Sequence, residues 1–139
     1  MKVVIDTNVV ISGTFWTGKS FQILKLVDQK KILMILTLPI LKEYDNIINS
    51  DEILEKITVY QKARIQVMQK ILNKAIFVEP KERVDIIKND PDDNKFLEAA
   101  IAGGADYIIS QDKKHLLILK KFRNIPILSP DEFLELIKK

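Results

Sequence analysis

Four acidic residues stand where an apolar run ends or a helix is expected to begin. They are Asp6 after KVVI, Glu43 in PILKEYDNII, Asp93 before NKFLEAAIAG, and Asp112 after YIISQ. Carboxylates gathered in one place repel each other unless a cation neutralises them. The chain has no Cys and only one His, so the ligands would be oxygens, which favour Mg²⁺ (or Mn²⁺) over Zn²⁺. The four acids are therefore predicted to be metal ligands and catalytic residues.

Such a cluster has a defined chemistry. Carboxylates that hold one or two Mg²⁺ ions can hydrolyse a phosphodiester bond, because one ion lowers the pKa of the attacking water and a second can stabilise the leaving oxygen. The number of ions stays open. Polar neighbours are predicted to orient the carboxylates and water without binding metal directly. These neighbours are Thr7, Asn8, Ser110 and Asn94.

Each acid also has a simpler, structural explanation. Asp6 or Asn8 could cap a following helical turn, and Glu43 could be a surface residue favoured by the helix dipole. In KNDPDDNKF, a turn with an N-cap could account for Asp90 or Asp92. One cap does not explain the whole polar triplet DTN between two apolar runs, however. The set as a whole therefore favours the metal site.

The elements that must position these acids follow from the apolar pattern. Continuous runs rich in β-branched residues predict strands at Lys2 to Asp6, Leu33 to Leu36, Asp106 to Ser110 and Ile125 to Leu128, with a weaker one at Ala75 to Val78. Apolar spacings of three and four predict helices over FQILKLVDQKK, PILKEYDNII, VYQKARIQVMQKIL, NKFLEAAIAG and PDEFLELIKK. The alternation predicts an α/β fold with a central parallel sheet of four to five strands. In such sheets, reactive groups gather beyond the carboxyl ends of the strands.

Length and composition limit the class of protein. The 139 residues suit one domain over 1–139, and 47% hydrophobic with 29% charged residues is an ordinary globular balance. No apolar run approaches the roughly 20 residues that cross a bilayer, and Asp6 interrupts the N-terminal run where a signal peptide would be apolar. We therefore expect a cytoplasmic protein. The net charge of +3 permits a polyanionic partner.

Taken in order, several segments resemble the PIN-domain family. They are VVIDTNVVIS, Glu43 in the second long helix, DPDDNKFLEAA and GGADYIISQD. The resemblance covers the whole chain and is closest to members described as toxin components of type II toxin-antitoxin systems. It implies a three-layer α/β/α sandwich and a metal-dependent endoribonuclease that leaves a 3′-hydroxyl and a 5′-phosphate. It also implies RNA and an antitoxin protein as partners.

Roles can be carried over residue by residue. Asp6, Glu43 and Asp93 match the family's invariant acids, and Asp112 matches a fourth acid. Ser110 matches the small hydroxyl residue that precedes this last acid.

One choice within the acidic loop depends on spacing. Asp93 is preferred over Asp92 because its distance to Ala100 fits the family's helix, and Asp90 is an additional candidate. Gln111 departs from the family pattern, where Gly or Arg is commoner, which leaves substrate preference open.

The segment GTFWTGKS, residues 13–20, matches the phosphate-loop pattern and offers an alternative function, a nucleotide phosphohydrolase. A phosphate loop must follow a strand directly and lead into a helix. The helix is predicted, but the strand would have to be VVIDTNVVIS, which would bury Asp6 and Asn8 inside a sheet. We instead expect Gly13 and Gly18 to shape a loop between helical segments.

Candidate contacts with RNA are Lys19, Lys113 and Lys114, since phosphate contacts supply most sequence-independent affinity. A solvated surface explains each of them equally well. The two aromatic residues of GTFWTGKS are expected to pack on the core or at an interface rather than stack on a base. His115, the only histidine, is interpreted as an exposed residue and is left out of the mechanism.

The predicted helix over 59–72 carries many apolar residues. They are Tyr60, Ala63, Val67, Met68 and Ile71. Burial in the core is the default interpretation, and surplus apolar area could form a homodimer or hold an antitoxin segment. A non-catalytic PIN-like scaffold that binds RNA or protein is a further alternative, but a scaffold has no need of a costly charge cluster. A haloacid-dehalogenase-type phosphatase would need Asp where Asn8 stands.

Overall fold

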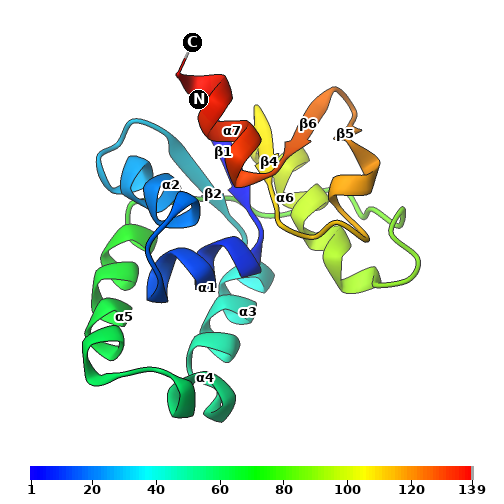
Figure 1. Cartoon of the computed structure of the whole chain (residues 1–139). Helices are drawn as coiled ribbons and strands as arrows, with labels where there is room; N and C mark the ends of the chain where they lie inside the picture. Colours follow the sequence, from blue (N-terminus) through cyan, green and yellow to red (C-terminus); the bar gives the residue numbers. More distant parts are fainter. Residues whose placement is uncertain (139) are drawn as a thin grey trace.

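The computed structural model describes residues 1–138, which are arranged around one six-stranded sheet (Figure 1). The strands are β1 (Lys2–Ile5), β2 (Leu33–Leu36), β3 (Ile76–Phe77), β4 (Tyr107–Ile109), β5 (Lys121–Phe122) and β6 (Ile125–Leu128). Their order across the sheet is β3-β2-β1-β4-β6-β5. Every neighbouring pair is parallel except β5 and β6, which are antiparallel.

Helices cover both faces of this sheet. They are α1 (Thr7–Phe15), α2 (Lys19–Asp28), α3 (Leu38–Ile48), α4 (Asp51–Lys56), α5 (Val59–Leu72), α6 (Asn94–Gly103) and α7 (Pro130–Ile137), with 3₁₀ turns η1 (Pro91–Asp93) and η2 (Leu117–Leu119). Helix α6 packs on β1, β2 and β4, whereas α2 packs on α1 and α7, and Figure 1 shows α2 and α6 on opposite sides of the strands. This is the expected three-layer α/β/α sandwich. Among residues 1–138, the helices are too short or too polar to span a bilayer.

The predicted strands are all present, but the sheet is larger than expected. The additional strand, β5, is only two residues long, and it returns into β6 through Arg123 and Asn124, which both have positive φ angles of 47° and 67°. Two residues leave too little pattern to predict a strand. The prediction of a central parallel sheet of four to five strands is confirmed by the five parallel strands, and β5 adds an antiparallel sixth strand at one edge.

The centre of the sheet explains why its strands are continuously apolar. The side chains of Val3, Val4 and Ile5 in β1 are fully buried, because helices cover both faces of the strand. Burying each such side chain contributes roughly 1.5–3 kcal/mol. The central strands therefore form a rigid base for the residues that follow them.

The strand order reverses between β1 and β4, and this reversal positions the candidate site. Ile5 pairs with Ile109, so Asp6 and Ser110 emerge side by side from adjacent strands. The Asp6 backbone N–H donates to the Ile109 carbonyl at 2.9 Å. A switch in strand order opens a crevice at the carboxyl edge of a parallel sheet, which is where ligands usually bind in this architecture.

The GTFWTGKS segment does not form a phosphate loop. Strand β1 ends at Ile5, and Gly13 lies within α1, so no strand leads directly into the segment. A Cβ atom at Gly13 would lie 2.6 Å from Leu24 Cδ1 and 2.8 Å from the Ser20 carbonyl oxygen. Gly18 precedes α2 with a φ of 128°, which favours glycine. Close packing of α1 on α2 and a tight turn therefore explain both glycines.

The two aromatic residues of this segment behave differently. Phe15 is buried in the core, as expected, whereas the Trp16 side chain is about half exposed. The rings meet edge to face, with centroids 5.9 Å apart.

Replacing Gly13 with Ala is expected to destabilise the fold by about 1–3 kcal/mol, because the added methyl group must displace backbone as well as side-chain atoms. Urea unfolding followed by circular dichroism measures this loss. Ser12→Ala, one position earlier in α1, is the control. Equal stability of Gly13→Ala and the control would show that α1 and α2 are not as closely packed as described.

Candidate functional site

Asp6 lies at the end of β1 and is only 6% exposed. Its Oδ2 atom accepts a hydrogen bond from Ser110 Oγ at 2.7 Å, and the same Oγ accepts from the Asp112 backbone N–H at 2.9 Å. The pKa of Asp6 is raised to about 6, mainly by burial; hydrogen bonds from Ser110 and the Thr7 backbone oppose this rise, and the charges of Asp112 and Glu43 add to it. A carboxylate with this pKa is poised to gain a positively charged partner.

Asp93 ends the η1 turn just before α6 and lies close enough to Asp6 and Asp112 to feel their charges. Burial, followed by the charges of Asp90, Asp6 and Asp112, raises the pKa of Asp93 to about 7. Its Oδ2 atom lies 3.4 Å from His115 Nδ1, and Asp112 Oδ2 lies 3.3 Å from the same nitrogen. The structure therefore brings the three predicted aspartates together.

Glu43 reaches the site from α3. The helix begins directly after β2, with the Thr37 side chain accepting the Ile40 N–H as an N-cap. Tyr44, the next residue, is fully buried, and its hydroxyl donates to the Ile5 carbonyl, which ties α3 to the end of β1. Glu43 is therefore held close to Asp6, whose pKa it helps to raise.

The Glu43 carboxylate already has partners. Thr7 donates its hydroxyl to Oε2, and Lys95 Nζ lies 2.6 Å from Oε1. Lys95, whose side chain is 11% exposed, also lies 2.7 Å from Asp92 Oδ2. The single positive charge of Lys95 thus offsets part of the negative charge of Glu43 and Asp92.

Within residues 1–138, no lysine or arginine nitrogen lies within 4.0 Å of Asp6, Asp93 or Asp112. Ligand atoms of Asp90, Asp93 and His115 lie within 4.8 Å of one another, a group that shares only Asp93 with the four predicted acids. Such a set of partly buried side chains, mostly with carboxylate oxygens, fits a hard divalent cation.

The other polar residues predicted to support the acids take different positions. Ser110 links Asp6 to the backbone of Asp112, and Thr7 bonds to Glu43, as such a supporting role requires. Asn8 is exposed on α1.

Asn94 is not brought together with the acids. Its buried Oδ1 accepts from the backbone N–H groups of Ile86 and Ile87 at 3.1 and 2.9 Å. Its Nδ2 donates to the carbonyls of Ile87 and Pro91 at 3.0 and 2.9 Å. The amide therefore organises the loop that leads into η1 and α6, rather than orienting a carboxylate as predicted from the sequence.

Asn94→Ala is expected to lower the free energy of unfolding by about 2–4 kcal/mol, because it leaves buried backbone groups without partners. Thermal and urea unfolding measure the change. Asn8→Ala removes an exposed amide and is the matched control, with an expected change below about 0.5 kcal/mol. Similar stabilities for the two variants would contradict the role assigned to Asn94.

Two of the predicted RNA contacts line one hollow, and the third lies on the surface. Lys19 and Lys113 line one hollow of about 330 Å³ together with Gln111, whose side chain donates to Ser20 Oγ at 3.1 Å. Lys19 is also 3.4 Å from Asp131 Oδ1, and Lys114 is exposed. Two of the three lysines therefore share a surface next to Asp112.

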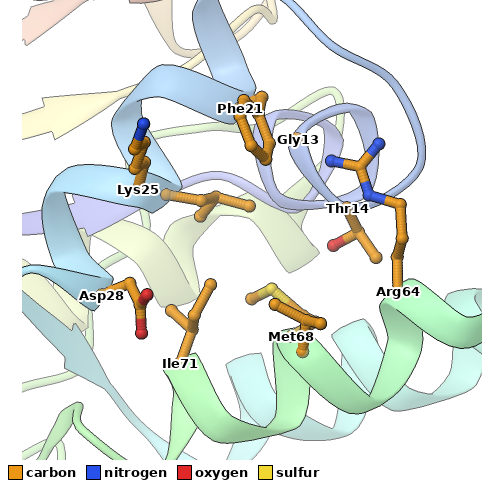
Figure 2. Close-up of a pocket in the computed structure, with 10 residues that line it drawn as sticks. Gly13, Thr14, Phe21, Lys25, Asp28, Arg64, Met68 and Ile71 are labelled. Carbon is orange, nitrogen blue, oxygen red and sulfur yellow. The ribbon is translucent and has the colours of Figure 1, made fainter.

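A second hollow, of about 200 Å³, lies between α2 and α5, and none of the four predicted acids lines it. Figure 2 shows Phe21 of α2 and Arg64, Met68 and Ile71 of α5 around this mainly apolar space. The Arg64 guanidinium lies 4.9 Å from the centre of the Phe21 ring.

Only some of the apolar residues of helix α5 are buried in the core, where all of them were expected. Met68 and Ile71 are buried, but Tyr60 is 88% exposed, and Ala63 and Val67 are also exposed.

Sequence reasoning missed two residues of the site, Lys95 and His115. His115 follows Asp112 by three residues, a spacing that brings side chains together in a helical turn, so a signal was present. No comparable signal predicted that Lys95 would reach Glu43, which lies 52 residues earlier in the chain.

Comparison with known proteins agrees with this architecture. A family model described as PIN domain matches residues 2–114, whereas no curated protein matches the sequence. A crystal structure of VapBC2 from Rickettsia felis bound to a DNA fragment from their promoter superposes with a TM-score of 0.57 and 13% identity, covering 93% of this chain and 98% of that one. A crystal structure of PAE2754 from Pyrobaculum aerophilum gives 0.59 and 12%, covering 100% and 91%. At these identities the likeness concerns the fold.

Proposed function

Because this chain belongs to the PIN domain family, we propose that it is a Mg²⁺- or Mn²⁺-dependent endoribonuclease that hydrolyses RNA phosphodiester bonds. The observation that carries the proposal is the convergence of Asp6, Asp93 and Asp112 without a lysine or arginine nitrogen within 4.0 Å among residues 1–138. Buried carboxylates with raised pKa values are unfavourable unless they have a function or a cation. In a metal-dependent nuclease, the carboxylates would have a function and would also bind a cation.

The residues that would hold the cation are Asp6, Asp93 and Asp112, with Glu43 near Asp6. When bound, the cation supplies activation of water and compensation of the phosphate's negative charge. Hydrolysis adds the oxygen of water to phosphorus and breaks the bond from phosphorus to the 3′ oxygen, which departs as the 3′-hydroxyl and leaves a 5′-phosphate.

Neighbouring residues keep this arrangement fixed. Ser110 holds one oxygen of Asp6 at 2.7 Å and is itself held by the Asp112 N–H, so one hydroxyl aligns two of the acids. Lys95 offsets part of the charge of Glu43 and Asp92, which lowers the repulsion that an approaching phosphate would meet on that side. The hollow lined by Lys19 and Lys113 offers a path for the RNA backbone, and the exposed Lys114 could add a further contact.

The biological role proposed is that of the toxin in a type II toxin-antitoxin pair, acting in the cytoplasm with an antitoxin protein as partner. Support comes from the family and from the fold shared with VapBC2. Helix α5 exposes Val59, Tyr60 and Val67, apolar area that could be covered in a homodimer or by the antitoxin. The structure does not support the alternative function of nucleotide phosphohydrolase, since no strand leads directly into GTFWTGKS.

A direct test incubates the purified protein with a mixed RNA pool in Mg²⁺ or Mn²⁺, with and without EDTA. Cleavage in either metal, its loss in EDTA, and 5′-phosphate ends on the products are expected. Undiminished cleavage in EDTA would contradict the metal-dependent mechanism. Stable RNA under all conditions would favour the remaining alternative, a non-catalytic scaffold.

A further inference from the structure

The only histidine of the chain lies among the acids of the proposed centre. We propose that His115 is a nitrogen ligand of the bound cation and that it shifts the preference of the site from Mg²⁺ toward Mn²⁺ and other first-row transition ions. This inference rests on the proposed metal-dependent nuclease, and it replaces the all-oxygen ligand set expected from the sequence.

The distances around the imidazole carry the inference. His115 Nδ1 lies 3.4 Å from Asp93 Oδ2 and 3.3 Å from Asp112 Oδ2. With a carboxylate oxygen of Asp90, the Asp93 and His115 ligand atoms form a set within 4.8 Å of one another. Adjacent ligands on an octahedral cation with bonds of about 2.1 Å are about 3 Å apart. The ligand atoms of Asp90, Asp93 and His115 are therefore close enough to share one ion after small movements, and Asp112 lies beside the same nitrogen.

The local backbone directs the imidazole into the cluster. Asp112 Oδ1 accepts the backbone N–H groups of Lys114 and His115 at 3.0 and 3.2 Å, which closes a turn and leaves Oδ2 facing Nδ1. The turn is anchored by Leu116, which is fully buried, and by the Leu117 N–H, which donates to the Asp112 carbonyl at 2.8 Å. The His115 side chain is 25% exposed, unlike a freely solvated surface histidine.

The type of ligand atom determines the metal preference. Carboxylate oxygens suit Mg²⁺ and Mn²⁺, but imidazole nitrogen binds transition ions much better than it binds Mg²⁺. One nitrogen in an otherwise carboxylate site therefore adds affinity for Mn²⁺ while adding little for Mg²⁺. The competing role for His115 is that of a simple counter-ion for Asp93 and Asp112, which would be displaced when a cation binds.

Spectroscopy of the Mn²⁺-loaded protein separates these roles, because any imidazole signal must come from the single histidine. Pulsed electron paramagnetic resonance is expected to show coupling between Mn²⁺ and a ¹⁴N nucleus. When histidine is selectively labelled with ¹⁵N, a ¹⁵N coupling should replace the ¹⁴N coupling. This control uses the wild-type protein, so it does not depend on the folding of a variant. Absence of imidazole coupling in protein that binds Mn²⁺ would overturn the inference and leave the proposed function standing.

Calorimetric titration provides the second measurement. His115→Gln is expected to weaken Mn²⁺ binding by about 10-fold or more, while Mg²⁺ affinity changes by less than about 2-fold. Lys121→Gln, an exposed residue of β5, is the control and should leave both affinities unchanged. An unchanged ratio of Mn²⁺ to Mg²⁺ affinity in His115→Gln would refute the ligand role. Failure of the wild type to bind either ion would refute the ligand role and the proposed function together.

Discussion

Asp6→Asn is expected to reduce RNA cleavage by about 100-fold or more while the metal-free variant is at least as stable as the wild type. The amide keeps the shape of the side chain but removes the charge that would bind the cation. Because burial raises the pKa of Asp6 to about 6, the buried charge also destabilises the metal-free fold at neutral pH, and Asn relieves this penalty. Loss of activity with a gain in stability distinguishes a functional residue from a structural one.

Two measurements check this expectation: single-turnover cleavage rates in Mn²⁺, and urea unfolding in EDTA. Asp45→Asn is the matched control, since Asp45 is an exposed acid on α3. It should retain wild-type activity within about 2-fold, as surface substitutions usually do. Activity of Asp6→Asn within tenfold of the wild type would remove Asp6 from the proposed metal site.

The stability of the metal-free protein is expected to fall as the pH rises from about 4 to about 7. An unfolded Asp has a pKa near 3.9, whereas burial raises the native pKa of Asp6 to about 6 and that of Asp93 to about 7. In this window the native state binds more protons than the unfolded state, so the free energy of unfolding decreases with increasing pH. The contribution is fully present below about pH 4 and is lost above about pH 7.

The comparison with Asp6→Asn isolates this effect from other titrating groups. In EDTA, the stability of Asp6→Asn relative to the wild type should increase by about 2 kcal/mol between pH 4.5 and pH 7.5. Urea unfolding at several pH values measures the difference. Saturating Mn²⁺ should reverse the order at pH 7.5, because only the native wild type gains the full binding energy. A difference that does not change with pH would mean that Asp6 is not protonated more readily in the native state.

The positions of Asp6 and Asp112 could be predicted because they depend on strand order and not on detailed packing. Continuous apolar runs mark strands buried on both faces, and the carboxyl ends of parallel strands share an edge. Ser110 then has to lie beside Asp6, because β4 pairs with β1.

Local sequence was less informative about the segment after β1. The β-branched residues of NVVIS favour a strand, so only one helical turn was predicted, yet the chain forms α1 over Thr7–Phe15. Tertiary packing overrides propensity here, since most of this helix is buried and the glycine within it permits close contact with α2. Helix α4, with six residues, was too short to leave a periodic pattern.

The partners of Glu43 and Asn94 could not be predicted either. Whether Glu43 faces the aspartates or Lys95 depends on the separation of α3 and α6, which lie far apart in the sequence. The amide of Asn94 satisfies the backbone of a loop whose path no periodicity describes. Distances between remote elements decide such side-chain pairings, and sequence spacing alone does not contain them.

Both margins of the sheet are formed by the shortest strands, β3 and β5, with two residues each. A margin of this length exposes few unpaired backbone groups, and at β5 the basic residues Lys120 and Lys121 repel a second copy of the same margin. Addition of a foreign strand is therefore disfavoured at either side. The molecule should accordingly resist fibril-like aggregation in concentrated solution.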